Sequence, residues 1–170
     1  MCTILFSKNT ASANSITLVM NRDEFLDRES EQPFLRSGSP RFYAPMDLRA
    51  GGTWIAVSES GLLACLTNRR AVPQLPDRMS RGRLVEMAAS MKTIQDVVEW
   101  LSSINAKHYN GFQLLVSNGL CSLLAAGDGI QMEYISLESG NHLITEMGIG
   151  PEHSHRARLA TSLLAKTAIG

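Results

Sequence analysis

The chain has 170 residues, of which 44% are hydrophobic, and its 16 basic and 16 acidic side chains give a formal net charge of zero. That length and apolar content suit one domain with a single buried core, and the balanced charge gives no electrostatic basis for binding nucleic acid or an anionic membrane surface. No stretch approaches the ~20 apolar residues of a membrane-spanning helix, and the first residues lack the basic and long apolar regions of a signal peptide, so we expect a cytoplasmic protein without a membrane span.

The first half of the chain is predicted to be rich in strands. Short β-rich runs predict strands at residues 2–6, 15–20, 53–58 and 62–67. Residues 29–50, in contrast, carry Pro33, Pro40 and Pro45 among polar side chains. We interpret this stretch as a long surface loop, of the kind that often serves as a lid or a binding segment.

The second half is predicted to begin and end with helices. Apolar residues at helical spacing predict helices over 81–89 and 94–104, and Thr93 with Asp96 three residues later resembles a capping box. Further β-rich runs predict strands at residues 112–117, 121–126, 131–136 and 142–145. Because tight turns separate these runs, we predict that they form one antiparallel meander, followed by a last helix over residues 154–168.

Cys2 opens the first predicted strand. If Met1 is removed, Cys2 carries both a thiol and a free α-amine. An α-amine, with an unperturbed pKa near ~8, can take the proton from the thiol of the same residue, so nucleophile and base would be one residue. The alternative is that Cys2 is a small apolar side chain that fills a strand.

Four polar residues, Asn21-Arg22-Asp23-Glu24, end the next predicted strand. An arginine and an acid on the strand beside an N-terminal cysteine could stabilise the thiolate and orient the amine, because a nearby cation lowers the pKa of a thiol. The alternative is a solvated turn.

Several motifs occur together along the first two thirds of the chain. They are Met1-Cys2, Asn21-Arg22-Asp23-Glu24, Gly51-Gly52-Thr53-Trp54, Leu66-Thr67-Asn68, Arg81-Gly82 and Tyr109-Asn110-Gly111-Phe112. In this order they resemble the NRDE family, which includes the transport and Golgi organisation protein 2 of animals. That family is similar in turn to the N-terminal nucleophile hydrolases of the cholylglycine hydrolase and penicillin acylase type, which cleave non-peptide amide bonds.

The resemblance implies an α+β fold of a defined kind. We expect a four-layer αββα sandwich, with two antiparallel sheets between helical layers, formed by a single domain over residues 1–170. The chain is short for the family, so this domain is either a compact variant or one that lacks a layer at its carboxyl end.

The resemblance also implies roles for individual residues. Cys2 matches the nucleophile, and Arg22 matches the arginine that contacts it. Asp23, and less closely Glu24, matches the acid that holds the amine. Asn68 follows a Gly-Leu strand at the position of an asparagine that contributes to the oxyanion hole.

Other residues are predicted to bind the substrate. The predicted set is Asn21, Glu24, Gly52, Thr53, Trp54, Asn110 and Arg156. Glycine at position 52 would let backbone amides approach a ligand, although a bulge or a tight start to the strand explains it equally well. Asn110 could present its amide to an oxyanion or simply form a turn with Gly111. Arg156 is a single late match to the hydrolases.

Five arginines make a local basic patch after the fourth predicted strand. They are Arg69, Arg70, Arg78, Arg81 and Arg83. Such a patch could receive a carboxylate or a phosphate of the substrate, and the alternative is a solvated loop.

The cysteines and histidines predict neither a disulfide framework nor a metal site. Cys2, Cys65 and Cys121 leave one thiol unpaired in any pairing scheme and lack the spacing of a zinc site. Cys65 and Cys121 lie in apolar runs, so we predict that both are buried.

Two functions of different classes follow. The first is a thiol hydrolase that cleaves an amide or thioester of a small molecule through Cys2. The second is a non-catalytic carrier of an apolar ligand, for which family members implicated in haem trafficking and in lipid or acyl-CoA homeostasis imply haem or an acyl or lipid ligand. Cys2 or His108 could supply an axial haem ligand, so the presence of side chains able to bind haem iron does not distinguish the two functions. We predict no resident cofactor for the hydrolase.

Overall fold

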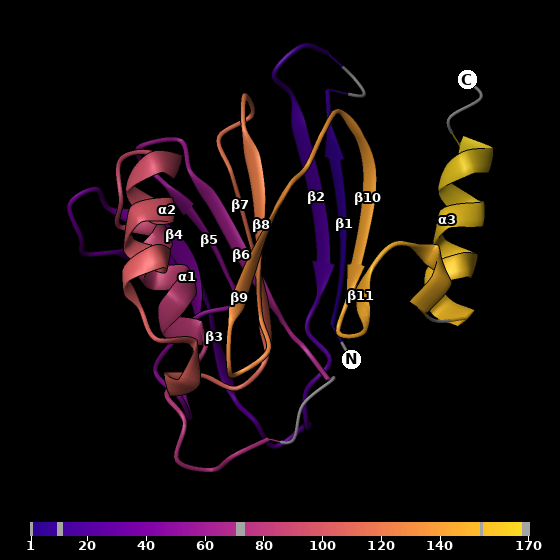
Figure 1. The fold of residues 1–170 in the computed structure, drawn as a ribbon. Coiled ribbons are helices and arrows are strands. Elements are labelled where there is room, and N and C mark those ends of the chain that lie inside the picture. Colours follow the sequence, from indigo (N-terminus) through magenta and orange to yellow (C-terminus); the bar gives the residue numbers. More distant parts are fainter. Residues whose placement is uncertain (1, 10–11, 71–73, 154, 168–170) are drawn as a thin grey trace.

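The computed structural model describes residues 2–9, 12–70, 74–153 and 155–167. Two antiparallel sheets lie face to face (Figure 1). The smaller sheet has the strand order β11-β10-β1-β2. Its strands are β1 (Thr3–Lys8), β2 (Ile16–Asn21), β10 (Gly140–Thr145) and β11 (Gly148–Ile149).

The larger sheet follows the chain in order from β3 to β9. Its strands are β3 (Ser30–Arg36), β4 (Phe42–Asp47), β5 (Ile55–Ser58), β6 (Leu63–Asn68), β7 (Phe112–Ser117), β8 (Ser122–Gly127) and β9 (Met132–Ser136). The central strands β6 and β7 are buried on both faces, as expected for continuous apolar runs inside a layered fold.

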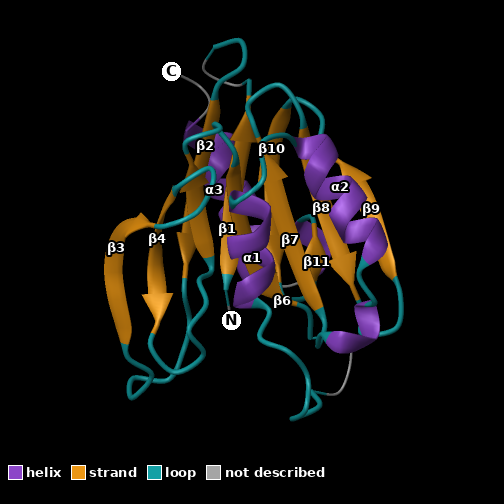
Figure 2. Ribbon diagram, turned by 90° about the vertical axis from the view of Figure 1, so that its left-hand side faces the viewer, coloured by secondary structure: helices purple, strands orange, loops and turns teal. Residues whose placement is uncertain are grey.

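Helices cover the outer faces of both sheets. Helices α1 (Gly82–Ala89) and α2 (Ile94–Ser103) lie on the larger sheet, and α3 (His155–Thr167) lies beyond the smaller one (Figures 1 and 2). Short 3-10 turns occur at Ala106–His108 and Pro151–His153. The α+β, four-layer αββα arrangement predicted from the motifs is therefore confirmed. No helix within the described residues is long and apolar enough to cross a membrane.

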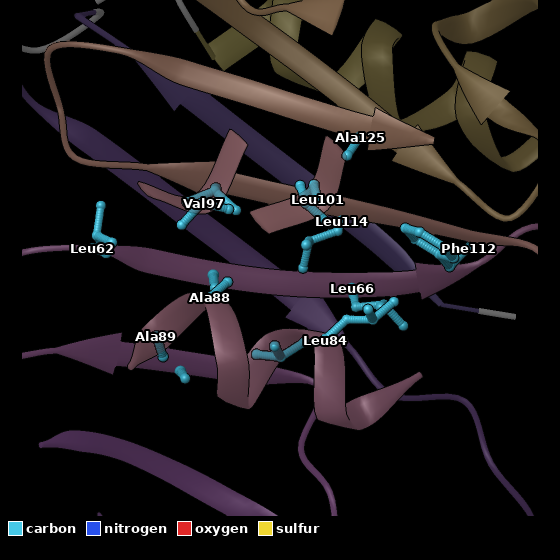
Figure 3. Close-up of a cluster of buried hydrophobic side chains, with 14 of the residues drawn as sticks. Leu62, Leu66, Leu84, Ala88, Ala89, Val97, Leu101, Phe112, Leu114 and Ala125 are labelled. Atoms are coloured by element: carbon cyan, nitrogen blue, oxygen red, sulfur yellow. The ribbon is translucent and has the colours of Figure 1, made fainter. Parts of the chain in front are cut away.

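Two apolar cores separate the layers. The first lies between α1, α2 and the larger sheet, where Leu84 of α1 packs against Leu66 of β6 (Figure 3). The second lies between the sheets and joins Ile4 and Ile144 to Cys65. Because successive side chains of a strand point to opposite faces, β6 supplies Leu66 to one core and Cys65 to the other.

The helical predictions agree with the structure. The capping box at α2 is complete, since the Thr93 hydroxyl accepts the Asp96 amide at 3.1 Å and the Asp96 carboxylate accepts the Thr93 amide at 2.9 Å. Such reciprocal bonds satisfy two of the amides that a helix start leaves without partners.

The predicted long loop over residues 29–50 is wrong. This stretch forms the antiparallel pair β3–β4 at the edge of the larger sheet (Figure 2). The regular register between the strands breaks between Glu31 and Phe34, and Pro33 and Pro45 lie at this irregularity. Proline lacks an amide hydrogen, so Pro33 of the edge strand β3 and Pro45 of its neighbour β4 are tolerated where the pairing of the two strands is already interrupted.

The predicted four-stranded meander is wrong in its last strand. Strands β7, β8 and β9 pair consecutively, but β10 crosses to the smaller sheet and pairs with β1 from Thr3↔Thr145 to Lys8↔Gly140. The crossover buries Leu137 and Ile144 between the sheets, which a fourth strand beside β9 would not do. The buried Gln113 of β7 also donates to the Thr145 carbonyl and so links the two sheets.

Candidate functional site

A pocket of about 290 Å³ opens where β1 begins and where β2 and β6 end. Most of the predicted site residues line it, namely Cys2, Arg22, Asp23, Glu24, Gly52, Thr53, Trp54, Asn68 and Asn110. Antiparallel pairing explains part of this gathering, because the start of β1 meets the end of β2 in the smaller sheet, and β6 of the facing larger sheet ends at the same pocket. Residues far apart in the sequence therefore share one cavity.

Cys2 is held by the strand pairing that follows it. The side chain is half-buried, and the pairing of β1 with β2 starts one residue later, at Thr3↔Asn21. The Thr3 amide donates to Asn21 Oδ1 at 2.8 Å, and Asn21 Nδ2 donates to Asp23 Oδ1 at 2.6 Å. Asn21 thus connects the backbone next to Cys2 with the carboxylate of Asp23.

Arg22 is held in the pocket by a ring and a carboxylate. Its guanidinium carbon lies 4.6 Å from the centroid of the Trp54 ring, and its Nη2 lies 3.3 Å from Asp47 Oδ2. A guanidinium suits this place because it can stack on an aromatic face and donate to a carboxylate at the same time.

Asp47 is a pocket residue that the sequence analysis missed. Arg28 donates to its Oδ2 through Nε at 2.9 Å, and the amides of Arg49 and Ala50 donate to Oδ1 at 3.1 Å each. Burial raises the pKa of Asp47, but these hydrogen bonds and the charge of Arg28 outweigh it and leave the pKa below its ordinary value. Arg28 also pairs with Glu24 at 3.1 Å. An aspartate whose side chain accepts hydrogen bonds from the amides two and three residues later is typical of a turn. Asp47 could have been found by this signal, but it lies in the stretch that we predicted as a loop.

Arg81, a member of the basic patch named in the sequence, lines the same pocket. Its Nη1 donates to the Gly111 carbonyl at 3.0 Å, and no carboxylate pairs with it among the described residues. Burial, followed by the charge of Arg28, lowers the pKa of Arg81, and the charges of Glu24 and Cys2 act in the opposite direction. Arg81 and Cys2 line the same pocket.

The two predicted amide donors differ in their surroundings. Asn68 is the last residue of β6 and lines the pocket. Asn110 also lines it, but its Oδ1 accepts the Leu75 amide at 2.8 Å and its Nδ2 donates to the Leu75 carbonyl at 2.9 Å. Asn110 thus anchors the backbone at Leu75 by two hydrogen bonds, and its role as an oxyanion donor stays a prediction.

Gly52 brings two backbones together. A Cβ built on Gly52 would lie 2.9 Å from the carbonyl carbon of Gly82, and one built on Gly82 would lie 2.9 Å from the Thr53 amide nitrogen. This approach fixes the start of α1 against the segment that carries Trp54 and leads into β5. The structure therefore favours the tight start to the strand over a ligand contact as the reason for glycine at this position.

Arg156 lies in α3, and its side chain is outside the described residues. It stays a prediction. As for metals, no group of three or more His, Cys, Asp or Glu side chains in the described part of the chain could hold an ion.

The cysteines other than Cys2 divide into one buried and one exposed thiol. Cys65 is fully buried, as predicted, and burial raises its pKa. Cys121 is exposed, so the prediction for it is wrong. Its amide donates to Asn118 Oδ1 at 2.8 Å in the turn between β7 and β8, one residue before β8 begins.

We expect this difference to control thiol chemistry in the native protein. Iodoacetamide should alkylate Cys121 and Cys2, whereas Cys65 should react only after unfolding, because the thiolate is the reactive species. Peptide mapping by mass spectrometry measures the three rates separately. Equal rates at Cys65 and Cys121 under native conditions would contradict the burial of Cys65.

The fold is similar to solved structures of amide hydrolases. The similarity extends to a Caenorhabditis elegans N-acylethanolamine-hydrolyzing acid amidase ortholog, with a TM-score of 0.67 and 12% identity over 98% of this chain and 79% of that one. It also includes a mutant of the conjugated bile acid hydrolase from Clostridium perfringens, with a TM-score of 0.58 and 10% identity over 85% of this chain and 53% of that one. Penicillin V acylase from Agrobacterium tumefaciens has a TM-score of 0.53 and 12% identity, covering 80% and 49% of the two chains. At these identities the likeness shows the fold alone.

Sequence comparison assigns the family. The chain is 31% identical over 127 residues to the Transport and Golgi organization 2 homolog of Mus musculus and 32% identical to the Homo sapiens homolog. The aligned part is 69% of this chain but only 45% of each relative. The family model for Transport and Golgi organisation 2 matches residues 1–152. The family resemblance predicted from the motifs is thereby confirmed, and the chain belongs to the Transport and Golgi organisation 2 family.

Proposed function

We propose that this protein is a thiol hydrolase that uses Cys2 to cleave a non-peptide amide or thioester of a small molecule. The observation that carries the proposal is the position of Cys2, half-buried at the mouth of a sheet in a pocket that also contains Arg22, Asp23 and Arg81. A thiol that only filled a strand would not need two guanidinium groups and a carboxylate around it.

The proposed reaction begins with removal of Met1. The free α-amine of Cys2 then takes the thiol proton, and Sγ attacks the carbonyl carbon of the substrate. The amide nitrogen or thiol of the substrate leaves with that proton as the acyl group remains on Sγ. Water then attacks the acyl carbon and gives a proton to the amine, the bond between the acyl carbon and Sγ breaks to release the acid, and the amine returns the proton to Sγ.

The surrounding groups suit the steps of this reaction. Arg22 and Arg81 supply positive charge to the pocket that holds Cys2, and Asp23, which accepts a hydrogen bond from Asn21, would orient the amine. Asn68 with a backbone N–H would stabilise the oxyanion that forms when Sγ adds to the carbonyl. The names of the solved neighbours support an amide or similar acyl bond as the target.

A substrate panel tests the proposal. The purified protein is incubated with an N-acylethanolamine, a conjugated bile acid, penicillin V and a short acyl thioester, and release of acid is measured. We expect turnover of at least one compound, lost in Cys2→Ala and retained in Cys121→Ser, whose exposed thiol lies outside the pocket.

Two results would contradict the hydrolase. Turnover by the Cys2→Ala protein would show that Cys2 is not the nucleophile. Binding of a panel compound or of haem without any turnover would favour the carrier function. For haem, Cys2 is the candidate ligand in this pocket, because His108 lines a separate hollow beside Leu75 and Lys107.

A further inference from the structure

The charges in the Cys2 pocket are not fully paired with one another. Its lining includes four arginines (Arg22, Arg28, Arg78 and Arg81) and three carboxylates (Asp23, Glu24 and Asp47). Asp47 pairs with Arg22 and Arg28, and Glu24 pairs with Arg28. Within the described part of the chain, no carboxylate pairs with Arg78 or Arg81.

Hydrogen bonds hold the chain around both of these arginines. Arg78 lies between two anchored positions, since Asn110 binds Leu75 through two hydrogen bonds and the Met79 amide donates to the His108 carbonyl at 2.8 Å. Arg81 is held through its own bond to Gly111. The guanidinium of Arg81, held by this bond, loses little further freedom when it binds a ligand, which favours recognition over simple solvation.

The start of α1 adds to the positive potential at this wall of the pocket. Helix α1 begins at Gly82, which lines the pocket, and the side chain of Arg81 makes no capping bond to the first turn. A helix start carries a partial positive charge from its aligned peptide dipoles, so it adds to the attraction that the two arginines exert on an anion.

We propose that Arg78 and Arg81 bind an anionic group of the substrate, a carboxylate or a phosphate, beside the bond that Cys2 attacks. The binding of the anion does not depend on the chemistry at Cys2, and only its assignment to a substrate rests on the proposed function. A half-buried guanidinium without a carboxylate partner has lost part of its solvation, and an incoming oxyanion restores it through charge-assisted hydrogen bonds. The hydrolase would accordingly prefer an acidic substrate to its neutral counterpart.

The test is an anion titration of the Cys2→Ala protein, which cannot use the proposed chemistry. Succinate and inorganic phosphate are added separately at constant ionic strength, and the indole N–H signals of both tryptophans are followed by NMR. Trp54 lines the pocket, whereas Trp100 lies in α2 and serves as the internal reference. We expect a saturable shift of the Trp54 signal, and the tighter of the two anions identifies the oxyanion that the pocket prefers.

Two further variants show whether Arg78 is responsible. Arg78→Ala should lower the affinity for the anion about tenfold or more, as expected for the loss of one charge-assisted contact. Arg83→Ala is the matched control, because Arg83 is exposed on the first turn of α1 and does not line the pocket. The protein with Arg83→Ala added should bind the anion with the same affinity as the Cys2→Ala protein.

The outcomes separate the anion site from the proposed reaction. No saturable shift with either anion, or the same affinity in Arg78→Ala as in the parent, would overturn the anion site even if the wild-type protein hydrolyses the panel. A shift that Arg78→Ala abolishes supports the site even if no panel compound is cleaved.

Discussion

A protein in which one residue precedes Cys2 is expected to lose about 10²- to 10⁴-fold in kcat/KM relative to the same chain beginning at Cys2, the usual contribution of a general base. The added residue converts the α-amine of Cys2 into an amide, which cannot accept the thiol proton. The positions of Arg22 and Asp23 do not depend on that amine, because strand pairing from Thr3 onward and the contacts with Asp47 and Asn21 hold them.

The comparison needs two preparations that differ only at this point. One chain is released from a cleavable fusion so that Cys2 is first, and the other keeps a single glycine before it. Succinate binding at Trp54 is the control and should be equal in both, because Arg78 and Arg81 lie in other segments. Equal hydrolysis by the two preparations would show that the α-amine is not the base.

Replacing Asp47 by asparagine is expected to lower the free energy of unfolding by about 2–3 kcal/mol at pH 7. The carboxylate is buried and holds Arg22 and Arg28 on Oδ2, and the change leaves both guanidinium groups without their shared counterion. Urea unfolding at equilibrium measures the loss. Glu59→Gln is the control, since the pair of Glu59 with Arg41 is exposed and its removal should cost much less.

The loss in Asp47→Asn is also expected to depend on pH. The folded-state pKa of Asp47 lies below its unfolded value of about 3.9, so its charge stabilises the fold above that pH and the contribution disappears as the pH falls through the folded value. The difference in stability between wild type and Asp47→Asn should therefore be constant from about pH 6 to 8 and shrink below about pH 4. A difference as large at pH 3 as at pH 7 would show that ionisation of Asp47 is not its cause.

The sequence predicted the part of the site that depends on local order along the chain. Strands β1 and β2 are consecutive and antiparallel, so the start of one meets the end of the other, and Cys2 necessarily lies near Arg22 and Asp23. Asn68 lines the same pocket because β6, in the larger sheet, ends there.

The part that the sequence did not predict depends on packing between distant segments. Asp47 belongs to a strand that its prolines concealed, and its partners Arg22 and Arg28 both come from the segment between β2 and β3. The sequence placed Arg81 in a basic patch, but its approach to Cys2 depends on Gly52 and Gly82, which let the start of α1 lie against the segment before β5, a contact that no periodicity in either segment signals.

The central claim is that Cys2, as the first residue of the mature chain, forms the acyl-enzyme. The most direct measurement is the mass of the N-terminal peptide from protein made in its own cells and quenched in acid during turnover of an acyl thioester. We predict a peptide that begins at Cys2 and carries the acyl group on its thiol. A peptide that retains Met1, or one that begins at Cys2 and carries no acyl group while substrate is being consumed, would contradict the claim.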